Sequence, residues 1–97
     1  MKYTEIINSN PYVLVEFYAS WCPHCQKMMP IVAEIKKLLA DTLKVEQFDI
    51  DEYQDLASEA GAESIPTFIL YHNGEECWRH SGEMPAETLL SEIQKHA

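Results

Sequence analysis

The chain has 97 residues, 46% of them hydrophobic and 10% aromatic, which suits one domain, residues 1–97, with one core. Sixteen acidic residues against seven basic ones give a net charge of −9, and this charge is repelled by nucleic-acid phosphates and by anionic membranes. We therefore expect no nucleic-acid partner and no membrane partner. We also expect the chain to act as a monomer.

The first ten residues contain neither the apolar run nor the small-residue cleavage pattern of a signal peptide. We therefore expect a cytoplasmic protein, or a periplasmic or secreted one if a leader peptide was removed. Residues 3–9 predict a short leading helix, which the Asn-Pro pair at positions 10 and 11 ends.

In the next part of the chain the pattern of apolar residues changes from that of a strand to that of a helix. A nearly continuous apolar run over residues 12–18 predicts a buried central strand. Apolar residues then recur at helical spacing over residues 23–39, where Pro23 fits the first helical position and Pro30 is expected to kink the interior. Residues 45–50 predict a second strand. A strand, a crossover helix and a strand form a right-handed βαβ unit, so the two strands are expected to be parallel.

The second half of the chain predicts a helix, a hairpin and a final helix. Residues 52–60 predict a helix that Gly61 ends. Residues 67–71 and 76–81 predict antiparallel strands, because the Asn-Gly pair between them supplies the positive φ angles of a tight hairpin turn. Pro85 is expected to open the last helix. The element order therefore predicts an α/β fold.

The chemical signal in the chain is a Cys-x-x-Cys formed by Cys22 and Cys25, where the first strand ends and the long helix begins. At the first turn of a helix, unpaired backbone N–H groups and the positive end of the helix dipole stabilise a thiolate. The second cysteine lies close enough to close a small disulfide with the first. Three cysteines cannot form a disulfide framework, so the pair favours redox or metal chemistry.

Several motifs follow one another in a single register along nearly the whole chain. They are Val15-Glu16-Phe17-Tyr18-Ala19, Trp21-Cys22-Pro23-His24-Cys25, Pro30, Asp49-Ile50-Asp51, Ile65-Pro66-Thr67, Asn73-Gly74 and Gly82. Together these motifs resemble the thioredoxin family. The resemblance implies a thioredoxin fold, with a mixed four-stranded sheet flanked by helices. Only eleven residues precede the central strand, so the first strand of a typical thioredoxin is expected to be absent.

The resemblance also implies a thiol–disulfide oxidoreductase that needs no cofactor and no metal. Its partners would be disulfide-containing or dithiol protein substrates, together with a reductase or an oxidant that recycles the cysteine pair. Cys22 would be the attacking thiolate and Cys25 the more buried thiol that resolves the mixed disulfide. Glu16 aligns with the buried acid of the family, and it would take the proton from Cys25.

A second implication of the resemblance is a cis peptide bond before Pro66, facing the cysteines. Such a bond lets the backbone of Ser64 and Ile65 approach the cysteines and hydrogen-bond an extended substrate. Trp21 and Gly82 are expected to form a hydrophobic substrate surface with Ile65 and Pro66.

The dipeptide Pro23-His24 between the cysteines bears on the direction of the chemistry. Thioredoxins usually carry Gly-Pro there, whereas Pro-His is found in DsbA, the strongly oxidising member of the superfamily. The imidazole of His24 can stabilise a thiolate at Cys22, which stabilises the reduced form and raises the reduction potential. DsbA, however, carries a large helical insertion between the two motifs, whereas Cys25 and Pro66 are only 41 positions apart here. We therefore expect a thioredoxin-type reductase; the alternative is a more oxidising, DsbA-like oxidase or isomerase.

A zinc-binding module is a further alternative. Cys77 and His80 add a Cys-x-x-His to the first pair, which makes a Cys₃His set at spacings that zinc sites use. Residues at i and i+3 of a strand point to opposite faces, so Cys77 and His80 would not converge without a bulge. The redox interpretation is therefore preferred to a zinc site, and Cys77 is expected to be a buried or half-buried free thiol.

Overall fold

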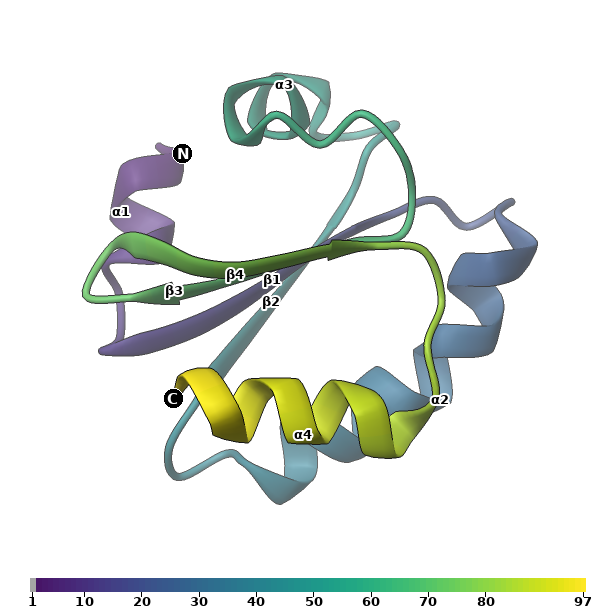
Figure 1. The fold of residues 1–97 in the computed structure, drawn as a ribbon. Helices are drawn as coiled ribbons and strands as arrows, with labels where there is room; N and C mark the ends of the chain where they lie inside the picture. Colours follow the sequence, from purple (N-terminus) through teal and green to yellow (C-terminus); the bar gives the residue numbers. More distant parts are fainter. Residues whose placement is uncertain (1) are drawn as a thin grey trace.

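The structure, a computed structural model, describes residues 2–97 as a single layered unit (Figure 1). The helices are α1 (Tyr3–Ile7), α2 (Pro23–Leu38), α3 (Gln54–Ala60) and α4 (Ala86–His96), and the strands are β1 (Tyr12–Tyr18), β2 (Lys44–Asp49), β3 (Thr67–His72) and β4 (Glu75–Ser81). The four strands form one sheet in the order β2-β1-β3-β4, with β1 parallel to β2 and the other neighbours antiparallel. This confirms the expected mixed four-stranded sheet. In residues 2–97 the segment before β1 forms α1.

Two pairs of helices cover the two faces of the sheet: α1 and α3 lie on one face, and α2 and α4 lie on the other (Figure 1). Strand β1 contributes to both cores because successive side chains of a strand point to opposite faces. Val15 and Phe17 pack in the core with α1 and α3. Leu14 packs in the core with α2 and α4. By the same alternation Glu16 points to the side of α2, where it is 1% exposed.

Local sequence signals account for several boundaries of these elements. Pro23 occupies the first turn of α2, and the helix continues through Pro30. Gly61 ends α3 with a φ of 71°, in the left-handed region that a Cβ disfavours. Asn73 and Gly74 have φ angles of 52° and 83°, so both central residues of the hairpin turn lie in the positive-φ region, as a type I′ turn requires.

Helix α3 begins later than the sequence predicts, whereas Pro85 opens α4 as its cap residue. Helix α3 begins at Gln54, because the N–H groups of Glu52 and Tyr53 both donate to the carbonyl of Asp49 and form a turn after β2. Helix α4 begins at Ala86, with Pro85 as an extended cap residue whose ψ is 152°. None of the helices within residues 2–97 combines the length and the apolarity that a membrane crossing requires.

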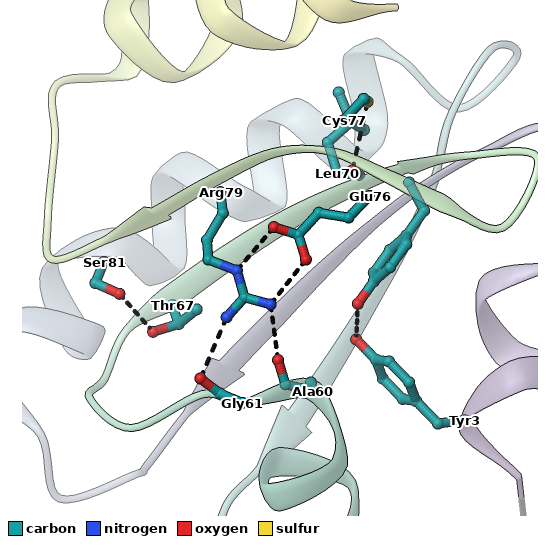
Figure 2. Close-up of polar contacts among 10 residues, drawn as sticks. Tyr3, Ala60, Gly61, Thr67, Leu70, Glu76, Cys77, Arg79 and Ser81 are labelled. Carbon is teal, nitrogen blue, oxygen red and sulfur yellow. Dashed lines mark hydrogen bonds and ion pairs between the residues drawn. The ribbon is translucent and has the colours of Figure 1, made fainter.

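Arg79 connects the edge strand β4 to the end of α3 (Figure 2). Its guanidinium donates to the carbonyl of Ala60 at 2.7 Å and to that of Gly61 at 3.2 Å. The same group forms two hydrogen bonds to the carboxylate of Glu76, at 2.9 and 2.8 Å. The carbonyls at the end of a helix lack partners within the helix, so Arg79 satisfies two groups that the end of α3 leaves free.

Candidate active site

Cys22 is the N-terminal cap residue of α2, at the point where β1 and a short turn lead into the helix. Its Sγ accepts a hydrogen bond from the backbone N–H of Cys25 at 3.2 Å. A cap side chain that accepts from the first turn satisfies one of the free N–H groups of the helix, and negative charge on that atom is favoured there. The side chain is 4% exposed. The helix start therefore holds the sulfur in place at the positive end of the helix dipole.

Cys25, one turn further into α2, has no exposed surface. It packs in a small cluster with Ala19 and Cys22, against which Ile65 is placed. Burial is the main cause that raises the pKa of the Cys25 thiol above its ordinary value, and the interaction with Cys22 raises it further. Both thiols are free, so the structure describes the reduced form of the pair. Cys25 therefore stays protonated until a base removes its proton.

Glu16 is the buried acid on the α2 face of β1. Its Oε1 accepts a hydrogen bond from Nε2 of Gln47 on β2 at 2.9 Å, and its buried Oε2 has no hydrogen-bond partner among residues 2–97. Burial raises the pKa of this carboxyl from 4.5 to about 7, and the bond from Gln47 opposes that rise. A carboxyl in this state can exchange a proton near neutral pH.

The segment before β3 brings a second loop to the cysteines. The Ile65–Pro66 peptide bond is cis, as expected. Ile65 is half-buried and packs against the cluster that holds Cys22 and Cys25. Gly82, with a φ of 102°, donates its N–H to the carbonyl of Pro66 at 2.8 Å. The hydroxyl of Thr67 donates to the carbonyl of Ser64 at 2.6 Å. These two bonds hold residues 64–67 and Gly82 together beside the cysteine pair.

Trp21 immediately precedes the first cysteine and is 62% exposed. Its indole Nε1 donates to the Oδ2 of Asp51 at 2.8 Å. This bond joins residues 30 positions apart, and such a contact leaves no local pattern in the sequence. The exposed indole is available to a partner, and the hydrogen bond with Asp51 orients it.

His24 lies on the outer side of the first turn of α2. Its Nδ1 is 2.9 Å from Oε2 of Glu83, in the loop between β4 and α4. Lys27 of α2 places its Nζ 3.9 Å from Oε1 of the same glutamate. The hydrogen bond with His24 is the main cause that holds the pKa of the Glu83 carboxyl below its usual range. Sequence reasoning did not single out Glu83, because 59 positions separate it from His24.

Cys77 does not lie where the sequence predicts. It is exposed rather than buried or half-buried, and its Sγ donates to the carbonyl of Leu70 at 3.4 Å (Figure 2). Leu70 pairs with Trp78 and Tyr71 pairs with Glu76, so Cys77 is the extra residue of a bulge in the edge strand. The bulge does not bring it to the other cysteines. Residues 2–97 contain no group of three or more His, Cys, Asp or Glu side chains that could hold a metal ion, which contradicts the zinc alternative built on Cys22, Cys25, Cys77 and His80.

Comparison with known proteins finds relatives along almost the whole chain. The sequence profile of one family, described as Thioredoxin, matches residues 1–95. The chain is 41% identical over 91 residues to a protein named Thioredoxin from Rickettsia typhi, covering 94% of this chain and 87% of that protein. It is 42% identical over 82 residues to Thioredoxin Y, chloroplastic, from Oryza sativa subsp. japonica, covering 84% of this chain and 49% of that protein. The chain thus spans about half the length of the chloroplastic relatives that it matches.

Solved structures agree with the sequence comparison. A mutant thioredoxin from Halobacterium salinarum NRC-1 superposes with a TM-score of 0.83 at 33% sequence identity, over 96% of this chain and 80% of that one. The oxidised form of mitochondrial thioredoxin 3 from Saccharomyces cerevisiae superposes with a TM-score of 0.86 at 27% identity, over 96% of this chain and 86% of that one.

Proposed function

Because this chain belongs to the thioredoxin family, we propose that it is a thiol–disulfide oxidoreductase that reduces disulfides of substrate proteins through Cys22 and Cys25. The single observation that carries the proposal is the geometry of the pair. Cys22 has its sulfur at the start of α2, where it accepts a hydrogen bond from the N–H of Cys25 at 3.2 Å, and Cys25 is fully buried one turn further into the helix.

The first step follows from the position of Cys22. Its thiolate attacks one sulfur of a substrate disulfide, the substrate S–S bond breaks, and the other substrate sulfur leaves as a thiolate that takes up a proton. The product is a mixed disulfide between Cys22 and the substrate. Cys22 is 4% exposed, so only a small part of it is open to the substrate sulfur.

The second step uses Cys25 and Glu16. Cys25 must lose its proton to become a nucleophile, and burial opposes that loss. Oε2 of Glu16, which is buried without a hydrogen-bond partner among the described residues, is the atom that we assign to accept the proton. The Cys25 thiolate then attacks Sγ of Cys22, the mixed disulfide breaks, and the second substrate sulfur leaves as a thiolate that takes up a proton. The substrate gains two electrons and the Cys22–Cys25 pair becomes a disulfide, which a recycling reductase must reduce.

The substrate is held, in this proposal, along the surface formed by Trp21, Ile65, Pro66 and Gly82. The exposed indole of Trp21 supplies apolar contact, and the backbone of Ile65 beside the cysteines supplies main-chain hydrogen bonds to an extended segment. Pro23 lies in the first turn of α2, where a backbone N–H would have no partner within the helix. Its fixed φ angle favours the start of the helix directly after Cys22. The protein would act as a monomer in the cytoplasm, where thiols stay reduced.

The equilibrium reduction potential of the Cys22–Cys25 pair tests the direction of this reaction. Measured against glutathione buffers, it should be about −270 mV, the value typical of thioredoxin. We also expect the protein to reduce a disulfide-bonded test protein with turnover when a dithiol supplies electrons. A value close to about −120 mV, the range of DsbA, would overturn the reductase direction in favour of a thiol oxidase or isomerase. A pair that forms no reversible disulfide would overturn thiol exchange altogether.

A further inference from the structure

The side chain between the two cysteines is engaged by a residue from the other end of the chain. His24 places its Nδ1 2.9 Å from Oε2 of Glu83, while the sulfur of Cys22 accepts its hydrogen bond from the backbone of Cys25. The imidazole thus has a carboxylate partner on the side of the β4–α4 loop. The other charged side chain placed against this pair is Lys27, whose Nζ is 3.9 Å from the second oxygen of Glu83.

The two residues next to Glu83 in the chain, Gly82 and Met84, are both hydrogen-bonded to other parts of the fold. Gly82 donates its N–H to the carbonyl of Pro66 at 2.8 Å. Met84 is 8% exposed, and its N–H lies 3.5 Å from Sδ of Met28 on α2. A residue between two such anchors has its backbone fixed relative to α2. The carboxylate of Glu83 is therefore built into the rim of the active site rather than reaching it from a free loop.

We propose that Glu83 is a positioning residue that pairs with the imidazolium of His24 and so reduces the stabilisation that His24 gives to the Cys22 thiolate. The inference rests on the proposed thiol exchange at Cys22 and Cys25, and it concerns a residue that adjusts the reduction potential of that pair. The family resemblance pointed to His24 alone; the counter-charge is a property of this structure.

The charges around the Cys22 sulfur determine the direction of this effect. An isolated imidazolium beside the thiolate stabilises it, which favours the reduced form and raises the reduction potential. A carboxylate hydrogen-bonded to that imidazolium makes the pair neutral overall, so its net attraction for the thiolate is smaller. Glu83 thereby gives a chain with the Pro-His dipeptide of an oxidant a potential closer to that of a reductase.

The replacement Glu83→Gln tests this, because glutamine retains hydrogen-bonding capacity toward Nδ1 and removes the charge. We expect the equilibrium constant for oxidation of the pair by glutathione to fall about threefold, a rise of roughly 14 mV in the reduction potential. The magnitude follows the modest energy of exposed ion pairs, and the measurement should use low ionic strength because salt screens them.

Two controls separate this role from a general change of charge or structure. Glu87→Gln removes the same charge from an exposed position in the first turn of α4, and it should leave the potential of the pair unchanged. In a His24→Gln background, Glu83→Gln should shift the potential by less than it does in the wild type, because the imidazolium is gone. A shift equal to that of Glu87→Gln, or a shift of full size in the His24→Gln background, would overturn the inference.

These outcomes are distinct from a failure of the proposed function. A wild-type pair that forms no reversible disulfide removes the proposed exchange and this inference together. A wild type that exchanges disulfides normally, but whose potential Glu83→Gln does not alter, removes the role of Glu83 alone.

Discussion

Gln47 and Glu16 face each other across two parallel strands, and Nε2 of Gln47 donates to Oε1 of Glu16 at 2.9 Å. The two residues are register partners of β2 and β1. The bond stabilises the charged form of a carboxyl that burial otherwise keeps protonated. The proton affinity of the buried acid is therefore set by opposing contributions from burial and from one neighbouring amide.

Replacing Gln47 with leucine should raise the pKa of Glu16 above its value of about 7, because the carboxylate loses its donor. We expect a rise of about one unit, from the energy of a hydrogen bond to a charged group. Titration of the Glu16 carboxyl by NMR measures the shift. The exposed Gln94 of α4 offers a control, and Gln94→Leu should leave the titration unchanged. A midpoint that falls or stays constant in Gln47→Leu would contradict the assigned role of this amide.

The buried carboxyl of Glu16 should make stability depend on pH. Its pKa is 4.5 in an ordinary setting and about 7 in the fold, so between these values the folded state holds a proton that the unfolded chain has released. The free energy of unfolding therefore falls as the pH rises from about 4.5 to about 7, by roughly 3 kcal/mol from this group, and stays at the lower value above that range.

Urea unfolding of the wild type and of Glu16→Gln between about pH 5 and pH 8 isolates this contribution, because the other titrating groups cancel in the difference between the two proteins. The glutamine variant should lose less stability than the wild type over this range. Two profiles that run parallel would show that Glu16 does not titrate there.

Replacing Cys25 with serine should trap mixed disulfides between Cys22 and substrate proteins, because the thiol that resolves them is gone. The variant is best made with Cys77→Ser, since Cys77 is exposed and could form adducts of its own. Non-reducing gels of a lysate incubated with the tagged protein detect the adducts. The matched control Cys22→Ser, which keeps Cys25, should capture nothing. Adducts of equal amount in both variants would argue against Cys22 as the attacking residue.

Replacing Arg79 with leucine should lower the free energy of unfolding by about 1–2 kcal/mol, because the carbonyls of Ala60 and Gly61 lose their charged donor. Glu76→Gln keeps those two bonds and weakens only the pair within β4, so its cost should be smaller. Thermal or urea unfolding of both variants measures the difference. Equal losses in both would mean that the ion pair, and not the end of α3, is what Arg79 stabilises.

Much of the fold and the reactive pair could be predicted from the sequence, because the signals are local. The apolar run at Tyr12–Tyr18, the change to helical period after Cys22 and the Asn-Gly turn each act within a few residues. The reactive position of Cys22 is equally local, since it depends only on a cysteine at the start of a helix. The resemblance to the family predicted Glu16 and Pro66 as site residues. In the structure Glu16 is buried, and the peptide bond before Pro66 is cis.

Other features depend on tertiary packing, because they join residues far apart in the chain. Glu83 meets His24 across 59 positions, and Trp21 meets Asp51 across 30. The exposure of Cys77 depends on a bulge whose register is set by pairing with β3. A local pattern cannot encode such contacts, since they depend on how loops are anchored and strands aligned once the core has formed. The sequence by itself determined the sheet, the helix start and the thiol pair. Only the tertiary structure decided which charges and amides surround that pair, because these groups are brought together by packing rather than by their spacing along the chain.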